Sequence, residues 1–148
     1  MNVYETQLNH ELLEKLISLS VDWEGEDSTY GYRRNERGDV EGNRIFLAEQ
    51  EGEIFGYLFG QEAKSERATS IMADGTVYFE IEELYVTPEW RNQGVGRALF
   101  TFVERELKAA GIEYMMLSTA TKNYKKILHF YIEELGMDFW SARLFKKL

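Results

Sequence analysis

The fold is decided by Arg91-Asn92-Gln93-Gly94-Val95-Gly96-Arg97-Ala98, eight residues that lie between a β-prone run and the first turn of an amphipathic helix. Glycines at such a place let the backbone come close to a ligand. The start of the helix also offers unpaired N–H groups at the positive end of its dipole. The stretch therefore predicts a backbone cradle for an anion, and a phosphate or pyrophosphate is the expected guest.

Two common phosphate-binding loops do not match this stretch. A P-loop needs Gly-Lys-Ser/Thr after its glycines, and no such triplet follows here. The dinucleotide fingerprint needs a third glycine where Leu99 stands. The loop must therefore serve a different kind of ligand.

Hydrophobic periodicity outside this loop predicts strands and helices along the whole chain. Strands are expected at residues 2–6, 44–50, 54–61, 76–86 and 114–118, with another in the apolar tail at 137–145. Helices are expected from the Asn9 cap to about Leu19, from the glycine loop to Gly111, and from the Asn123 cap to Gly136. The remaining long segments, 21–43 and 63–75, are predicted to be irregular.

Two kinds of connection follow from this order of elements. Hairpins join the first long strands, whereas helices connect the later ones. We therefore predict an α/β fold with a mixed, mostly antiparallel central sheet and helices on both faces. The only proline is Pro88 and no linker divides the chain, so residues 1–148 are expected to form a single domain.

Composition narrows the function. The chain has 148 residues, of which 44% are hydrophobic, and this is typical of a globular protein. With no cysteine and two histidines, neither a cysteine-ligated metal nor a three-histidine site can form, so no metal is expected. No signal peptide or membrane span is apparent, which predicts a cytoplasmic protein. A net charge of −9 argues against nucleic acid and membrane partners.

The motif Arg91-x-x-Gly94-x-Gly96 resembles the signature Gln/Arg-x-x-Gly-x-Gly/Ala of the GNAT family of N-acetyltransferases. Residues 84–90, which read Leu-Tyr-Val-Thr-Pro-Glu-Trp, are similar to the strand and turn that lead into that loop. Phe130-Tyr131 followed by Leu135-Gly136 extends the likeness, and the order of elements agrees across nearly the whole chain. The resemblance implies a GNAT-like fold and an acetyl-CoA-dependent N-acetyltransferase.

The resemblance also implies how acetyl-CoA would bind as co-substrate. Amides of residues 93–97 would hold the pyrophosphate, and the backbone of residues 84–86 would pair with pantetheine. Asn123 resembles a position that touches pantetheine or the substrate, although its place as a helix cap explains it equally well. The predicted cofactor-binding residues are Leu84, Tyr85, Val86, Arg91, Asn92, Gln93, Gly94, Val95, Gly96, Arg97 and Asn123.

The chemistry needs a base, because an alkyl ammonium of pKa about 10 is almost wholly protonated at pH 7. Glu80 and Glu82 are the candidates, since uncompensated carboxylates on a central strand must face a partner, solvent or a cleft. Glu80 lies fourteen residues before Gly94, a spacing similar to that of the base in some relatives. Period two puts Glu83 on the opposite face unless a bulge intervenes. Pairing with basic side chains explains any one of these acids equally well.

The departing thiolate needs a proton donor, and Tyr131 resembles the tyrosine that serves the coenzyme sulfur. The same side chain also lies on an apolar stripe, where a core aromatic is expected. Gly136 lies five positions after it, where the family usually has a step of four, so the end of the helix is expected to bulge. The resemblance further implies that a strand N–H near Tyr85 meets the oxyanion.

The acceptor is expected at the acidic, aromatic segment 21–43, which suits a cationic amine such as an aminoglycoside or polyamine. A solvated acidic loop is the plain alternative. Within the enzyme class, a protein N-terminus or lysine is a second acceptor, and a non-catalytic acetyl-CoA-binding regulator is the rival from another class. The apolar tail 139–148 can reach a neighbour's sheet edge, so a homodimer is one expectation.

Overall fold

A single mixed sheet organises the molecule, and the computed structural model describes all 148 residues. Its strands follow the spatial order β1-β2-β3-β4-β5, with β1 to β4 antiparallel and β5 parallel to β4. Their bounds are β1 Asn2–Thr6, β2 Arg44–Gln50, β3 Glu53–Lys64, β4 Val77–Val86 and β5 Tyr114–Met116. The predicted mixed, mostly antiparallel sheet is confirmed.

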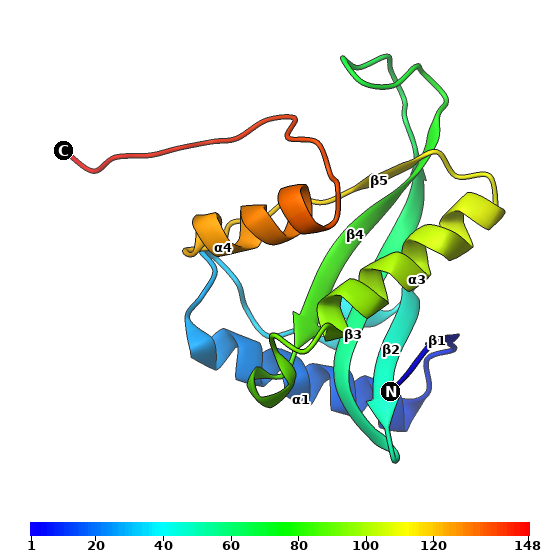
Figure 1. Ribbon diagram of the computed structural model, residues 1–148, viewed down its shortest axis with the longest axis vertical. Helices are drawn as coiled ribbons and strands as arrows, with labels where there is room; N and C mark the ends of the chain where they lie inside the picture. The colour runs from blue at the N-terminus through cyan, green and yellow to red at the C-terminus, as the bar shows by residue number, and fades with distance from the viewer.

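Helices cover both faces of the sheet, as Figure 1 shows. One face packs α1 (His10–Glu26) over a cluster that includes Leu16, while the other packs α3 (Val95–Ala109) over a cluster that includes Phe100. The short elements are α2 (Arg37–Val40), the 3-10 turn η1 (Pro88–Trp90), and α4 (Tyr124–Leu128), which continues as the π-helical turn η2 (His129–Glu134). None of these helices has the length and apolar character needed to cross a membrane.

Helix α1 is longer than predicted. It was expected to end near Leu19, but it runs on to Glu26, so the segment 21–43 is not wholly irregular. Trp23, one turn beyond Leu19, packs against the apolar cluster beneath the helix and continues its buried stripe. The helix stops at Asp27, which has a left-handed φ of 50° and donates its backbone N–H to the Glu24 carbonyl.

The tail does not form the strand predicted for residues 137–145. The last assigned element ends at Glu134, and no later residue belongs to a helix or strand. Apolar, β-prone side chains are not enough for a strand, because each strand needs an edge with which to pair. Within one copy of this chain the tail has no such pairing.

Candidate active site

Strands β4 and β5 diverge toward their C-terminal ends, and a cavity of roughly 1050 Å³ lies between them. Strands β4 and β5 pair only through residues 78–80 and 114–116. Beyond Glu80 they part, as Figure 1 shows, so the cavity is lined by residues 81–86 on one side and 117–121 on the other. An unpaired strand edge of this kind can accept an extended ligand as an added strand.

The glycine loop forms the second wall of this cavity. Gly94 is the N-cap of α3, and its φ of 85° is a conformation that favours glycine. The first turn of the helix closes with the Ala98 N–H on the Gly94 carbonyl at 2.9 Å, so the amides of residues 95–97 have no partner in the chain. Three free amides at the positive end of a fifteen-residue helix form a cradle of a kind that suits an anion such as a diphosphate.

Gly96 contributes space rather than conformation. A Cβ at this position would lie 3.2 Å from Cζ of Phe130, so glycine lets η2 pack closely against the start of α3. Phe130 and its neighbour Tyr131 both line the cavity. Gly96 therefore also sets how closely η2, which forms one wall of the cavity, approaches the free amides at the start of α3.

The side chain of Arg91 is committed to the protein. Its guanidinium bonds both carboxylate oxygens of Glu26, at 2.6 and 2.9 Å, and its Nε donates to the Val86 carbonyl at 2.8 Å. Glu26 also accepts from the Tyr85 hydroxyl at 2.8 Å. Burial alone would raise the pKa of Glu26, but the bonds from Arg91 and Tyr85 hold that pKa below its ordinary value. Arg91 thus joins the end of α1 to β4 and the cofactor loop.

Most of the other predicted cofactor residues also line the cavity. Gln93 lies outside the lining, and its side-chain amide caps the Glu89 carbonyl at 2.9 Å. Arg97 forms an ion pair with Glu134 at 3.6 Å, and Asn123 accepts the Lys126 amide at 3.4 Å as the cap of α4. The remaining members found in the lining are Leu84, Tyr85, Val86, Asn92, Gly94, Val95 and Gly96.

A β-bulge in β4 rearranges the candidate bases. Phe59 lies opposite Glu83 and Gly60 opposite Ile81, so Glu82 has no partner on β3. The bulge reverses the alternation of side chains, which brings Glu83 to the face of α1 together with Tyr85. Gly60 permits it, because a Cβ there would collide with the Glu80 carbonyl and the Phe79 ring.

Glu83 is the buried carboxylate of the cavity, with 9% of its surface exposed. It accepts hydrogen bonds from the Tyr57 hydroxyl at 2.7 Å, the Asn35 amide at 3.0 Å and the Tyr32 hydroxyl at 3.2 Å. Burial raises the pKa of Glu83, and this effect exceeds the opposing effect of the three donors. A raised pKa brings the carboxyl closer to the range where it can both take and release a proton.

The two glutamates predicted as bases lie in different surroundings. Glu82 is exposed and lines the cavity. Glu80 lies opposite Gln61 in the paired part of the sheet, outside the lining, and burial followed by the charge of Glu82 raises its pKa. The sequence placed Glu83 on the opposite face from these two unless a bulge intervened, and the bulge at Glu82 is what brings Glu83 into the cavity.

Tyr131 lies on the π-helical turn η2, where the helix accommodates the extra residue before Gly136. Its ring packs toward Phe100 with centroids 6.4 Å apart, while its hydroxyl has no hydrogen-bond partner in the chain. Burial raises the pKa of Tyr131 to about 12, so the phenol keeps its proton. A protonated, unbonded hydroxyl in the lining is available as a donor.

An aromatic stack forms the wall opposite α4. Trp23 lies between Tyr32, with centroids 4.1 Å apart, and Tyr85, at 5.3 Å. The loop after α1 pairs with the segment before α4, because the Tyr30 amide donates to the Ala120 carbonyl at 3.0 Å and the Lys122 amide to Ser28 at 2.9 Å. The segment that was predicted to face the acceptor therefore closes one side of the cavity.

Comparison with known proteins identifies the family. The family model described as "Acetyltransferase (GNAT) family" matches residues 9–137. The chain belongs to the GNAT family. Comparison of this GNAT sequence with curated proteins gave no match.

Solved structures share the fold of this GNAT chain at low sequence identity. An aminoglycoside acetyltransferase from an uncultured soil metagenomic sample has a TM-score of 0.70 at 19% identity, over 100% of this chain and 99% of that one. A transcriptional regulator from Bacillus halodurans scores 0.71 at 21% identity, over 99% and 100%. An aminoglycoside N-acetyltransferase in complex with CoA scores 0.64 at 19% identity, over 99% and 98%. These likenesses support the GNAT-like fold.

Proposed function

We propose that this chain transfers an acetyl group from acetyl-CoA to the primary amine of a cationic small molecule. The observation that carries the proposal is the position of Glu83, a buried carboxylate that lines the same cavity as the three free amides of α3. The family supports the use of an acyl-CoA. The free amides and the open edge of β4 fit the diphosphate and the pantetheine arm of acetyl-CoA.

Each proton in the reaction has a candidate carrier in the cavity. Acetyl-CoA supplies the acetyl group as an activated thioester. Glu83 takes a proton from the acceptor ammonium, directly or through one water, and the freed nitrogen lone pair forms the new C–N bond. Tyr131 gives its phenolic proton to the sulfur as the C–S bond breaks. The nitrogen of the new C–N bond then releases its second proton, which restores the phenol of Tyr131 and leaves a neutral amide, while Glu83 passes the first proton to water. The N–H near Tyr85 faces the negative charge that develops on the acetyl oxygen.

Glu83 is preferred to Glu82 as the proton acceptor for a physical reason. Glu82 is exposed, so water screens its charge, whereas Glu83 is buried and fixed by Tyr57 and Asn35. A fixed base of raised pKa is matched to an amine better than a mobile, hydrated one. Glu82 then serves as a second negative group for a cationic acceptor.

The charges of the lining favour a cationic acceptor. Two of its four carboxylates, Glu26 and Glu134, are paired with arginines, while Glu82 and Glu83 have no basic partner. Tyr32 stacks on Trp23 with one face of its ring and donates to Glu83 through its hydroxyl, so its other face is the aromatic surface on which a cation can stack beside Glu83. Two of the fold relatives are described as aminoglycoside acetyltransferases, which makes aminoglycosides the first acceptors to test.

The test is thiol release from acetyl-CoA with an amine panel. The panel contains an aminoglycoside, a polyamine, a peptide with one lysine, and a peptide with a free N-terminus and no lysine. We expect turnover with the first two and little with the peptides. Turnover confined to either peptide would reject the cationic small molecule and favour a protein acceptor.

Binding without turnover would reject the enzyme assignment. Calorimetric titration with CoA is therefore run beside the turnover assay, because one fold relative is described as a transcriptional regulator. CoA binding with no turnover on any amine would favour a non-catalytic regulatory module. If CoA does not bind, both the enzyme assignment and the regulatory module are rejected.

A further inference from the structure

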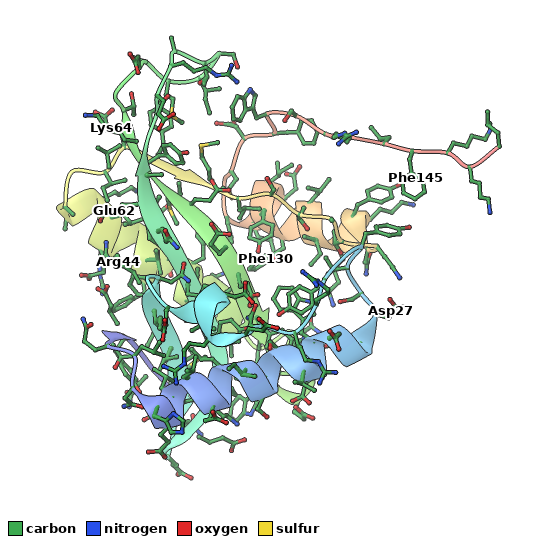
Figure 2. All side chains as sticks on the ribbon, turned by 180° about the vertical axis from the view of Figure 1, so that it is seen from behind. Asp27, Arg44, Glu62, Lys64, Phe130 and Phe145 are labelled. Atoms are coloured by element: carbon green, nitrogen blue, oxygen red, sulfur yellow. The ribbon has the colours of Figure 1, made fainter.

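Three of the four polar side chains that are buried in the molecule belong to one hydrogen-bonded network: Ser20, Asn35 and Glu83. The Asn35 backbone N–H donates to the Ser20 hydroxyl of α1 at 2.9 Å, and the Asn35 side-chain amide donates to Glu83 of β4 at 3.0 Å. Buried polar groups that are fully paired hold a single arrangement. The network therefore fixes the segment 27–36, which leaves α1 at Asp27 and passes over β4 toward α2 (Figure 2).

The two carboxylate oxygens of Glu83 have different surroundings. Oε2 accepts from the Tyr57 hydroxyl at 2.7 Å and from the Asn35 amide at 3.0 Å, and neither donor lines the cavity. Oε1 accepts only from the Tyr32 hydroxyl, at 3.2 Å, and Tyr32 does line the cavity. Each carboxylate oxygen has about two acceptor positions. Oε2 is therefore fully used, so Oε1 is the oxygen that can take a proton.

The Tyr32 hydroxyl connects Oε1 to the cavity. The ring of Tyr32 is held by its stack on Trp23, with centroids 4.1 Å apart, while Glu83 itself is only 9% exposed. A phenol can accept one hydrogen bond while it donates another. Burial and the charge of Glu83 raise the pKa of Tyr32 well above its ordinary value, so the phenol keeps a proton throughout the physiological range. Tyr32 can therefore pass a proton on, but it does not store a negative charge.

We propose that the Tyr32 hydroxyl relays a proton of the acceptor ammonium to Oε1 of Glu83. This inference rests on the proposed acetyl transfer and specifies the route by which its base is reached. As an N–H bond of the ammonium breaks, its electron pair stays on nitrogen and the proton bonds to the Tyr32 oxygen. The original O–H bond of Tyr32 breaks at the same time, and that proton bonds to Oε1. The ammonium and the carboxylate both become neutral, Tyr32 is unchanged, and after the transfer the proton returns through the same hydroxyl to water.

The relay lets Glu83 be both buried and reachable. Burial raises the pKa of Glu83, and the negative charge of Asp39 on α2 raises it further, whereas the three hydrogen bonds that the carboxylate accepts lower it. Opening Glu83 to an acceptor would also open it to water, and hydration of the carboxylate would remove the main cause of the raised pKa. The Tyr32 hydroxyl covers Oε1, so it keeps water away from the carboxylate while it moves the proton.

The test is the dependence of kcat/KM on pH, measured with an amine that turns over in the panel. Tyr32→Phe keeps the ring and its stack on Trp23 but removes the hydroxyl. We expect the maximum of kcat/KM above the acid limb to fall by about 10²-fold, because the proton must then pass through water that is not held in place. The acid limb should also move to higher pH, since one donor that lowers the pKa of Glu83 is lost. Unchanged thermal unfolding checks that the fold is intact.

Tyr57→Phe is the matched comparison, because it also removes one phenolic donor from Glu83, but from a residue outside the cavity lining. The bond from Tyr57 lowers the pKa of Glu83 more than the bond from Tyr32 does. The acid limb should therefore move further than in Tyr32→Phe, whereas the maximum of kcat/KM should fall far less. Asn35→Ala removes the other donor to Oε2 and should resemble Tyr57→Phe.

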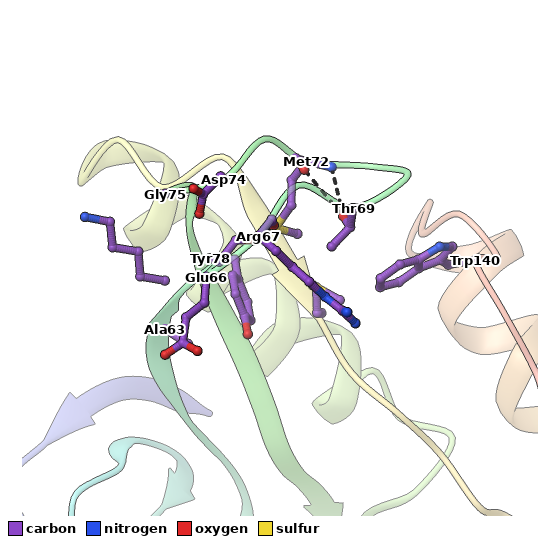
Figure 3. A pocket seen from close by; sticks show the side chains of 12 residues that line it. Ala63, Glu66, Arg67, Thr69, Met72, Asp74, Gly75, Tyr78 and Trp140 are labelled. Atoms are coloured by element: carbon purple, nitrogen blue, oxygen red, sulfur yellow. Dashed lines mark hydrogen bonds between the residues drawn. The ribbon is translucent and has the colours of Figure 1, made fainter.

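Tyr78→Phe controls for the loss of a tyrosine hydroxyl on the same strand as Glu83. Tyr78 lies near the start of β4 and lines a second cavity, of roughly 1070 Å³, beside the loop between β3 and β4 (Figure 3). It makes no hydrogen bond to Glu83, whose donors are Tyr57, Asn35 and Tyr32. We expect neither the acid limb nor the maximum of kcat/KM to change in this variant.

An unchanged maximum of kcat/KM in Tyr32→Phe would overturn the relay and leave Tyr32 only an influence on the pKa of Glu83. Equal losses in Tyr32→Phe and Tyr57→Phe would overturn it as well, because a general disturbance of the network would then explain both. Glu83→Gln separates this inference from the proposed function. A fully active Glu83→Gln variant rejects Glu83 as the base, whereas a loss there without a loss in Tyr32→Phe rejects the relay alone.

Discussion

The parts of the chain before and after Leu107 differ in how deeply their side chains are buried. Every buried side chain lies at or before Leu107, and most belong to the two clusters on either face of the sheet. No residue after Leu107 is fully buried, although half-buried side chains such as Tyr131 pack against the cluster under α3, and β5, α4 and η2 form one wall of the cavity. The free energy of folding therefore comes mainly from the first part, while the second part contributes part of the cavity wall.

The candidate functional groups also fall into two sets, one before Leu107 and one after it. The glycine cradle and Glu83 belong to the tightly packed part, whereas Tyr131 belongs to the less buried part. A base and an anion cradle must keep fixed positions, and a packed core provides them. A wall that admits and releases ligands is drawn from the less stable part of a fold.

Phe100→Ala should have the largest effect, because Phe100 is 2% exposed and lies in the cluster under α3. We expect it to lower the free energy of unfolding by about 3–5 kcal/mol through lost burial and a residual cavity. Tyr124→Ala on exposed α4 is the control and should cost less than about 0.5 kcal/mol. Urea unfolding followed by circular dichroism measures both, and similar losses would remove the distinction between the two parts.

Glu83→Gln should lower kcat/KM by about 10²–10⁴-fold, the usual contribution of a positioned base. Glutamine keeps the size of the side chain and an acceptor for Tyr57, so CoA affinity should be unchanged. Glu82→Gln is the matched control and should change kcat/KM by less than about tenfold. If Glu82→Gln lowered kcat/KM more than Glu83→Gln, the base would instead be Glu82, one of the two residues that the sequence predicted.

The pH profile sharpens the same assignment. Protonated Glu83 cannot take a proton, so kcat/KM should fall as the pH drops through the pKa of Glu83. Because burial raises this pKa, the fall should be centred above the ordinary glutamate value of about 4.3. Initial rates at a series of pH values measure it. Glu82→Gln should keep this acid limb and Glu83→Gln should lose it.

Tyr131→Phe should lower kcat by about 10²-fold, near the lower end for a positioned acid. Its hydroxyl has no partner in the chain, so the free energy of unfolding should stay within about 0.5 kcal/mol of the parent. Calorimetry should give the same CoA affinity. An unchanged kcat would reject Tyr131 as the proton donor and leave it only a packing role on the apolar stripe.

Arg91→Lys should have the smallest effect of the series, a loss of about tenfold in CoA affinity, or about 1.4 kcal/mol. Lysine keeps the charge but lacks the planar fork that bonds both oxygens of Glu26 and the Val86 carbonyl. The loop should then be held less firmly against β4. Arg37→Lys, in an exposed pair with Glu41, should leave CoA affinity unchanged in the same titration.

Local patterns predicted the elements of the fold well, because hydrophobic periodicity and glycine stops act over a few residues. The hairpin of β2 and β3, the strand β4 and the cap of α3 follow from such signals. The end of α1 was missed because the charged residues after Leu19 obscured Trp23, which continues its buried stripe. The tail was mispredicted as a strand because its pattern says nothing about the presence of a partner.

The glycine loop that lines the cavity could be predicted from its own residues, whereas the position of Glu83 could not. Glu83 reaches the cavity through a bulge that Gly60 on β3 permits, and Tyr57 and Asn35 bond it from other elements. Such contacts join residues far apart in the sequence. The extra residue before Gly136 did signal the π-helical turn that carries Tyr131.

The bulge at Glu82, which has no partner on β3, affects how related sequences should be aligned with this chain. Removing that one residue would restore strict alternation and exchange the faces of everything from Thr76 to Ile81 relative to the glycine loop. An alignment gap shifted by one position would then match a core leucine of one protein with an ionisable side chain of another. Acids on the cavity side of the bulge are best located by counting backwards from Gly94, because the register from Glu83 to Val86 contains no further irregularity.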